Sequence, residues 1–78
     1  MNNPKYNHRD NVKIKISGMI EDIPISVTKE FFIKTIDLHE YEDGYGRHSY
    51  FRYYLVKDLI FDQKGRWVNE SEIIGISE

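Results

Sequence analysis

Apolar and polar residues alternate with a period of two along the first third of the chain. In residues 12–17 each even-numbered residue is Val or Ile and each odd-numbered residue is Lys or Ser, which is the pattern of a half-buried β-strand. Gly18 interrupts the alternation and indicates a bend or bulge. A polar turn at residues 21–22 follows, and the alternation resumes in residues 23–27. These segments are predicted to form a hairpin. Because Pro24 has no N–H to donate to a neighbouring strand, the second strand is expected to lie at a sheet edge or to begin at an edge.

Residues 28–41 fit two descriptions. A short helix capped by Thr28 would bring Phe32, Ile33 and Ile36 to one side. Alternatively, a strand begins near Ile33, which the β-branched and aromatic content of the segment favours. We predict the strand and keep the helix as the alternative.

A second hairpin is predicted around residues 42–46, where an Asp and two Gly residues supply turn chemistry. The turn separates two alternating segments, residues 33–41 and 48–57. Alternate residues of the second segment face opposite sides: one face carries Phe51, Tyr53 and Leu55, and the other carries Tyr50, Arg52, Tyr54 and Val56. Aromatic side chains on both faces are expected for a central strand, or for a strand whose outer face binds a partner.

The last third of the chain contains further turn signals. Asp62 and Gly65 have the spacing of a tight hairpin, in which Gly65 is predicted to take a positive φ. Trp67, the only Trp, follows directly and is predicted to anchor the core. Asn69 and Glu72 have the spacing of a capping box, and the residues after them leave room for one helical turn or a short closing strand.

The order of elements in this part of the chain resembles that of SH3-like small β-barrels of the Tudor, KOW or bacteriophage type: a strand at 54–56, a hairpin at 62–65, a strand at 67–68, a helical turn at 69–72 and a strand at 73–74. Residues 11–15 are similar to a first barrel strand, whereas the long middle segment departs from the shorter strands of a minimal barrel.

Together these patterns predict a mostly β fold. We expect one small domain over residues 11–78, built as an antiparallel sheet or an SH3-like barrel of about five strands, with one short helical turn. A flexible N-terminal arm at residues 1–10 is expected to precede it.

Composition narrows the class of protein. The 78 residues are 40% hydrophobic and 31% charged, with eleven Ile, six Tyr and no Ala, which is a globular composition biased toward β structure. The absence of Cys excludes disulfides, thiolate nucleophiles and Cys-based metal sites. No apolar run is long enough to span a bilayer and no signal region follows the N-terminus, so a cytoplasmic protein without membrane contact is expected. The size and composition suggest an origin in a phage or mobile element.

Acidic and His residues gather around the predicted 42–46 turn. Asp37, His39 and His48 could supply metal ligands from neighbouring strands. A solvated acidic hairpin tip explains the same residues more simply, and we predict no metal and no cofactor. The tip is also a candidate surface for a basic partner, and its residues are Glu40, Glu42 and Asp43.

The strand face that carries His48, Tyr50, Arg52 and Tyr54 is the main candidate binding site. Flat rings beside a cation suit a peptide or single-stranded nucleic acid. The structural alternative is a half-exposed sheet face with Arg packed along Tyr rings. A net charge of −2 without a basic excess favours a protein partner over nucleic acid.

No nucleophile motif or phosphate-binding glycine loop is present, and so short a chain leaves little room for a substrate pocket. We therefore predict a small non-catalytic binding protein, an accessory factor or inhibitor that acts through a protein–protein interface, and not an enzyme. A nucleic-acid-binding small barrel is the alternative. A homo-oligomer formed by pairing of exposed strand edges is a third hypothesis.

Overall fold

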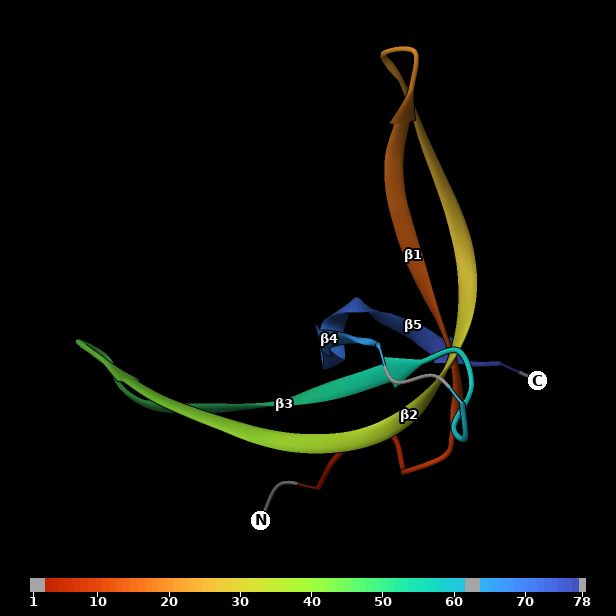
Figure 1. Ribbon diagram of the computed structural model, residues 1–78. Helices are drawn as coiled ribbons and strands as arrows, with labels where there is room; N and C mark the ends of the chain where they lie inside the picture. The colour runs from red at the N-terminus through yellow and green to blue at the C-terminus, as the bar shows by residue number, and fades with distance from the viewer. Residues whose placement is uncertain (1–2, 62–63, 78) are drawn as a thin grey trace.

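The computed structural model describes residues 3–61 and 64–77 and shows a five-stranded antiparallel sheet (Figure 1). Its elements are β1 (Asn11–Ile20), β2 (Ile23–Asp43), β3 (Gly46–Val56), β4 (Arg66–Asn69), the 3-10 helix η1 (Glu70–Glu72) and β5 (Ile73–Ile76). The strands lie side by side in the order β4-β3-β2-β1-β5. Strands make up 68% of the structure, which confirms the prediction of a mostly β fold with one short helical turn.

The sheet is open. β4 and β5 form its two edges, and it is not closed into a barrel. Of the two predicted arrangements, the antiparallel sheet is therefore the one that the structure shows. The order of elements after β3 follows the prediction, and the Asn69 backbone N–H donates to the Glu72 carboxylate at 2.6 Å where η1 begins.

β2 is one continuous strand of 21 residues, so the helix alternative for residues 28–41 is wrong. Its first half pairs with β1 and its second half, from Phe32 onward, pairs with β3. A register shift between Ile33 and Thr35 marks a bulge close to this changeover. Gly18 pairs with Ile25 without a register shift, so of the bend or bulge predicted there, a bulge is not formed.

The two hairpins extend away from each other as two arms. Figure 1 shows the β1–β2 hairpin rising from the centre of the molecule and the β2–β3 hairpin projecting to one side. We call residues 15–28 the first arm and residues 36–51 the second arm. The radius of gyration is 14.6 Å, whereas a compact domain of this length would have about 11.5 Å. Much of the sheet therefore lies outside the centre of the molecule.

β3 and β4 are joined by residues 57–65. Asp62 and Gln63, the first two residues of the tight hairpin predicted at 62–65, lie outside the described residues. Ahead of them, the Asp58 carboxylate accepts hydrogen bonds from the backbone N–H groups of Ile60 and Phe61 at 2.8 and 3.0 Å. These bonds close a turn soon after β3 ends.

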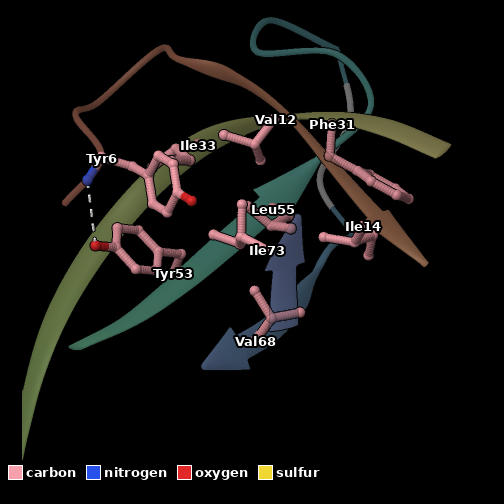
Figure 2. Close-up of a cluster of buried hydrophobic side chains, with 9 residues drawn as sticks. All are labelled: Tyr6, Val12, Ile14, Phe31, Ile33, Tyr53, Leu55, Val68 and Ile73. Carbon is pink, nitrogen blue, oxygen red and sulfur yellow. Dashed lines mark hydrogen bonds between the residues drawn. The ribbon is translucent and has the colours of Figure 1, made fainter. Parts of the chain in front are cut away.

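The core lies on the inner face of the sheet, where the arms meet (Figure 2). Its buried cluster consists of Tyr6, Val12, Ile14, Phe31, Ile33, Tyr53, Leu55, Val68 and Ile73. Tyr53, Ile33 and Leu55 have no exposed surface. Trp67 is 47% exposed, so the prediction that it anchors the core is wrong. Trp67 pairs with Tyr54 and points, like Tyr54, away from the face that carries Tyr53 and Leu55.

The N-terminal segment contributes Tyr6 to this core. The Tyr6 ring meets the Tyr53 ring edge-on, with centroids 5.7 Å apart. The Tyr53 hydroxyl donates to the Glu70 carboxylate at 2.6 Å and accepts from the Tyr6 backbone N–H at 3.4 Å (Figure 2 shows the second bond). The Lys5 backbone N–H also donates to Glu70, at 3.2 Å. The flexibility expected of residues 1–10 stays a prediction, but this segment is joined to η1 through Glu70.

We predict that Tyr53→Ala unfolds the domain and that Trp67→Ala does not. Truncating a buried aromatic residue costs about 3–5 kcal/mol, which is close to the whole stability of many small domains. Trp67→Ala removes the contacts with Tyr54 and Arg52, and aromatic and cation–π pairs of this kind each contribute about 0.5–1.5 kcal/mol. Circular dichroism during urea unfolding measures both variants. A folded Tyr53→Ala protein beside an unfolded Trp67→Ala protein would contradict this assignment of the core.

We also predict a loss of stability at alkaline pH that depends on Tyr53. Burial, with the Glu70 hydrogen bond adding to it, raises the pKa of Tyr53 from 10.0 to about 12. The folded protein thus holds this proton more tightly than the unfolded chain does. Its contribution to stability is fully present below about pH 10 and is lost as the pH rises through about 12.

Urea midpoints measured across that pH range check the prediction. Tyr53→Phe keeps the ring and lacks the titrating hydroxyl, so its midpoint should decline less with pH than that of the wild type. Equal declines in the two proteins would show that Tyr53 does not carry the effect.

Candidate functional site

The outer face of the sheet, opposite the core, carries the predicted residues His48, Tyr50, Arg52 and Tyr54. Directly paired residues in neighbouring strands point to the same face. Among the residues that the two ladders bring to this face are Tyr41, which pairs with His48, His39, which pairs with Tyr50, Asp37, which pairs with Arg52, and Trp67, which pairs with Tyr54. We call these eight residues the aromatic face.

Arg52 organises the end of the aromatic face nearest β4. Its Nη2 lies 2.8 Å from the Asp37 Oδ2 in a half-exposed ion pair, and its Cζ lies 5.2 Å from the centroid of the Trp67 ring. The Trp67 ring is in turn tilted against Tyr54, with centroids 5.1 Å apart. The guanidinium is therefore held between a carboxylate and an indole, and its position is fixed without a ligand.

The other end of the aromatic face lies on the second arm. Tyr41 stacks on His48 with centroids 5.2 Å apart and meets Tyr50 edge-on at 6.0 Å. The centroids of the His39 and Tyr50 rings lie 5.0 Å apart. Tyr41 is 45% exposed. This group therefore presents flat rings to solvent, and the rings already pack against one another.

The acidic residues at the tip of the second arm are divided between the two faces. Glu40 pairs with Ser49 and Glu42 with Arg47, on the side opposite the aromatic face. Asp43 accepts hydrogen bonds from the Tyr45 backbone N–H at 2.7 Å and makes a 3.1 Å contact with His48 Nε2. The structure therefore does not form one acidic surface from the predicted residues Glu40, Glu42 and Asp43.

The metal ligands considered from the sequence are engaged in other contacts. Asp37 pairs with Arg52 and His48 contacts Asp43, while His39 packs on Tyr50. Within residues 3–61 and 64–77, no three His, Asp or Glu side chains are grouped as a metal site would require.

Sequence reasoning did not assign Tyr41 or Trp67 to this face. Tyr41 could have been found by counting back from the turn, because the pairing of Asp43 with Gly46 sets Tyr41 opposite His48. Trp67 was placed in the core because it is the only Trp. The alternation with the buried Val68 shows that it faces outward.

Gly65 fixes the chain beside Tyr54. Its backbone N–H donates to the Tyr54 hydroxyl at 2.8 Å. A Cβ at this position would overlap the Leu55 carbonyl oxygen and lie 2.9 Å from Val56 Cγ1. The predicted positive φ is wrong, since the described glycine with a positive φ is Gly46, at 124°. Glycine is required at 65 by the close approach of two chain segments.

Comparison with known proteins supplies no family for the chain: no family model matches it, and no curated protein or solved structure is significantly similar to it. In the part of the chain that the structure describes, no helix is long and apolar enough to cross a membrane.

We predict that Gly65→Ala and Gly65→Asn both lower the free energy of unfolding by about 1–3 kcal/mol, because either side chain must displace the β3 backbone. Gly18→Ala is the matched control, since a Cβ there meets no atom within 4 Å and should change stability by less than about 1 kcal/mol. Urea unfolding compares the three. A Gly65→Asn protein as stable as the wild type would contradict the steric explanation and indicate that Gly65 is needed for its backbone conformation.

Proposed function

We propose that this protein is a small non-catalytic binding protein, and that its partner is another protein that contacts the aromatic face. The observation that carries the proposal is the placement of Trp67 and Tyr41. They are 47% and 45% exposed and lie at opposite ends of one face, with Tyr54, Arg52 and Tyr50 between them.

Residues of these types are the ones in which binding energy concentrates at protein interfaces. Trp, Tyr and Arg are enriched among residues whose truncation weakens binding by about 2 kcal/mol or more. On the aromatic face their rings and the Arg52 guanidinium already contact one another. Less side-chain entropy is then lost when a partner binds than would be lost from freely rotating side chains.

The charges on the aromatic face support a protein partner over nucleic acid. Binding to a phosphate backbone requires cations that can neutralise phosphates. Arg52 is paired with Asp37 at 2.8 Å, and His48 contacts Asp43 at 3.1 Å. The face therefore presents aromatic rings around a cation that a carboxylate already neutralises. This composition is typical of the desolvated centre of a protein interface.

The test is the double variant Tyr41→Ser/Trp67→Ser, which removes the two exposed rings and spares the half-buried Tyr54. Leu38→Ser/Ile74→Ser is the matched control, because these side chains are 45% and 58% exposed and lie outside the aromatic face. Both variants should unfold in urea close to the wild type. In pull-downs from the native host lysate analysed by mass spectrometry, the aromatic variant should lose at least about 90% of a partner that the control retains.

Three results would contradict the proposal. A partner captured equally by both variants would place the interface elsewhere. Capture of nucleic acid, with affinity that falls steeply between low and physiological salt, would support the nucleic-acid-binding alternative. A wild-type protein that light scattering shows to be an oligomer, and that the aromatic variant makes monomeric, would mean that the aromatic face binds a second copy.

A further inference from the structure

A groove of about 370 Å3 lies on the inner face, between the base of the first arm and the chain that enters β4. Its floor is formed by Ile16, Phe31 and Leu55. Figure 2 shows Phe31 at the end of the buried cluster, far from Tyr6 and Tyr53. We call this feature the basic groove, for the side chains around it.

The rim of the basic groove is cationic. Its polar side chains are Lys29, Lys57, Lys64 and Arg66, and none of the described residues that line it is acidic. Lys29 pairs with the core residue Ile14, so its side chain is directed to the inner face. The Arg66 Cζ lies 6.0 Å from the centroid of the Phe31 ring. Lys57 and Lys64 make other interactions within the chain, so the positive charge offered to a ligand is that of Lys29 and Arg66. These two side chains border an apolar floor, in a chain whose net charge is −2.

A strand edge runs beside this groove. The ladder between β2 and β3 begins at Phe32, so residues 23–31 of β2 pair with β1 on one side and with no described strand on the other. Unpaired backbone N–H and C=O groups of such an edge accept an extended peptide as an additional strand.

We propose that the basic groove binds an extended acidic peptide segment, which adds as a strand to the edge of β2 at residues 23–31. An apolar side chain of the peptide enters above Phe31 and Leu55. Side chains two positions before and after it share the same face of an extended strand, so carboxylates there meet Lys29 and Arg66. This site lies opposite the aromatic face and does not depend on the function proposed for that face.

The strand edge distinguishes a peptide from other anions. Phosphate groups and nucleic acid would use the cations, but they would gain nothing from backbone groups arranged for β pairing. The volume of the groove is that of a small ligand pocket, which accommodates one large side chain. Charge complementarity and backbone pairing therefore favour the same occupant.

The test uses a fluorescein-labelled peptide with the sequence Glu-Thr-Phe-Thr-Glu, titrated with the 78-residue protein and followed by fluorescence anisotropy. We expect saturable binding that weakens at least about tenfold in Lys29→Glu/Arg66→Glu, because two attractive contacts become repulsive. Lys15→Glu/Lys34→Glu is the matched control. It makes the same change in net charge at two exposed lysines outside the groove, and it should bind within about threefold of the wild type.

Backbone pairing is tested by two N-methylated peptides, one methylated at both Thr residues and one at Phe and the second Glu. Alternate N–H groups of a strand point to opposite sides, so one of these peptides should lose binding and the other should retain it. If a peptide with Lys in place of Glu binds equally well, the charge argument is overturned. Equal loss or equal retention for the two methylated peptides overturns strand addition.

The remaining outcomes also decide the question. An absence of saturable binding up to about 1 mM peptide overturns the proposal. Tighter binding of oligo(dT) or inorganic phosphate than of the peptide, lost in Lys29→Glu/Arg66→Glu, would show an anion site without peptide recognition. Because Tyr41→Ser/Trp67→Ser leaves the groove unchanged, it should bind the peptide as the wild type does. Failure of peptide binding at the basic groove and failure of partner capture at the aromatic face can therefore be distinguished.

Discussion

The organisation of this molecule depends on the length of β2. A strand of 21 residues is several times the usual length of about five or six, and no single partner covers it. β1 pairs with its first half and β3 with its second half. The two hairpins therefore share one strand and meet only around its middle, where the register shift near Ile33 redirects the chain.

In this arrangement the buried core and the solvent-exposed side chains occupy different parts of the sheet. The buried cluster gathers near the middle of β2, together with Tyr6 and the short strands β4 and β5. Beyond it, each arm is a two-stranded ribbon whose faces cannot both be covered by so short a chain. Side chains such as Tyr41 on the second arm and Ile23 on the first are 45% and 62% exposed as a result. The aromatic face begins at Trp67 beside this centre and continues along the second arm, and the basic groove lies at the base of the first arm.

The alternation of apolar residues was sufficient to predict the strands, the two hairpins and the common face of His48, Tyr50, Arg52 and Tyr54. The prediction succeeded because, in a strand, side chains two residues apart lie on the same face, so the alternating pattern shows directly which side chains share a face. The continuity of β2 could not be read in the same way, since residues 28–41 satisfy both a helical and an extended pattern until their partners are known. Trp67 and Gly65 were misassigned for a related reason. Residue type indicated burial for the first and a positive φ for the second. The environments of both are instead set by β3, through strand pairing for Trp67 and through the close approach of the β3 backbone for Gly65.

The joining of both arms to one strand also has a consequence for how the folded protein fluctuates. Phe32 of β2 belongs to both ladders, and the buried cluster covers this part of the strand. We expect the amide groups there to exchange with solvent mainly when the whole domain opens. Towards Ile23 at one end and Asp43 at the other, hydrogen bonds are held by a single neighbouring strand, and brief local separation is enough to release them. We therefore expect one strand to contain both strongly and weakly protected amide groups. The two arms should open locally and independently of each other, around a centre that stays closed.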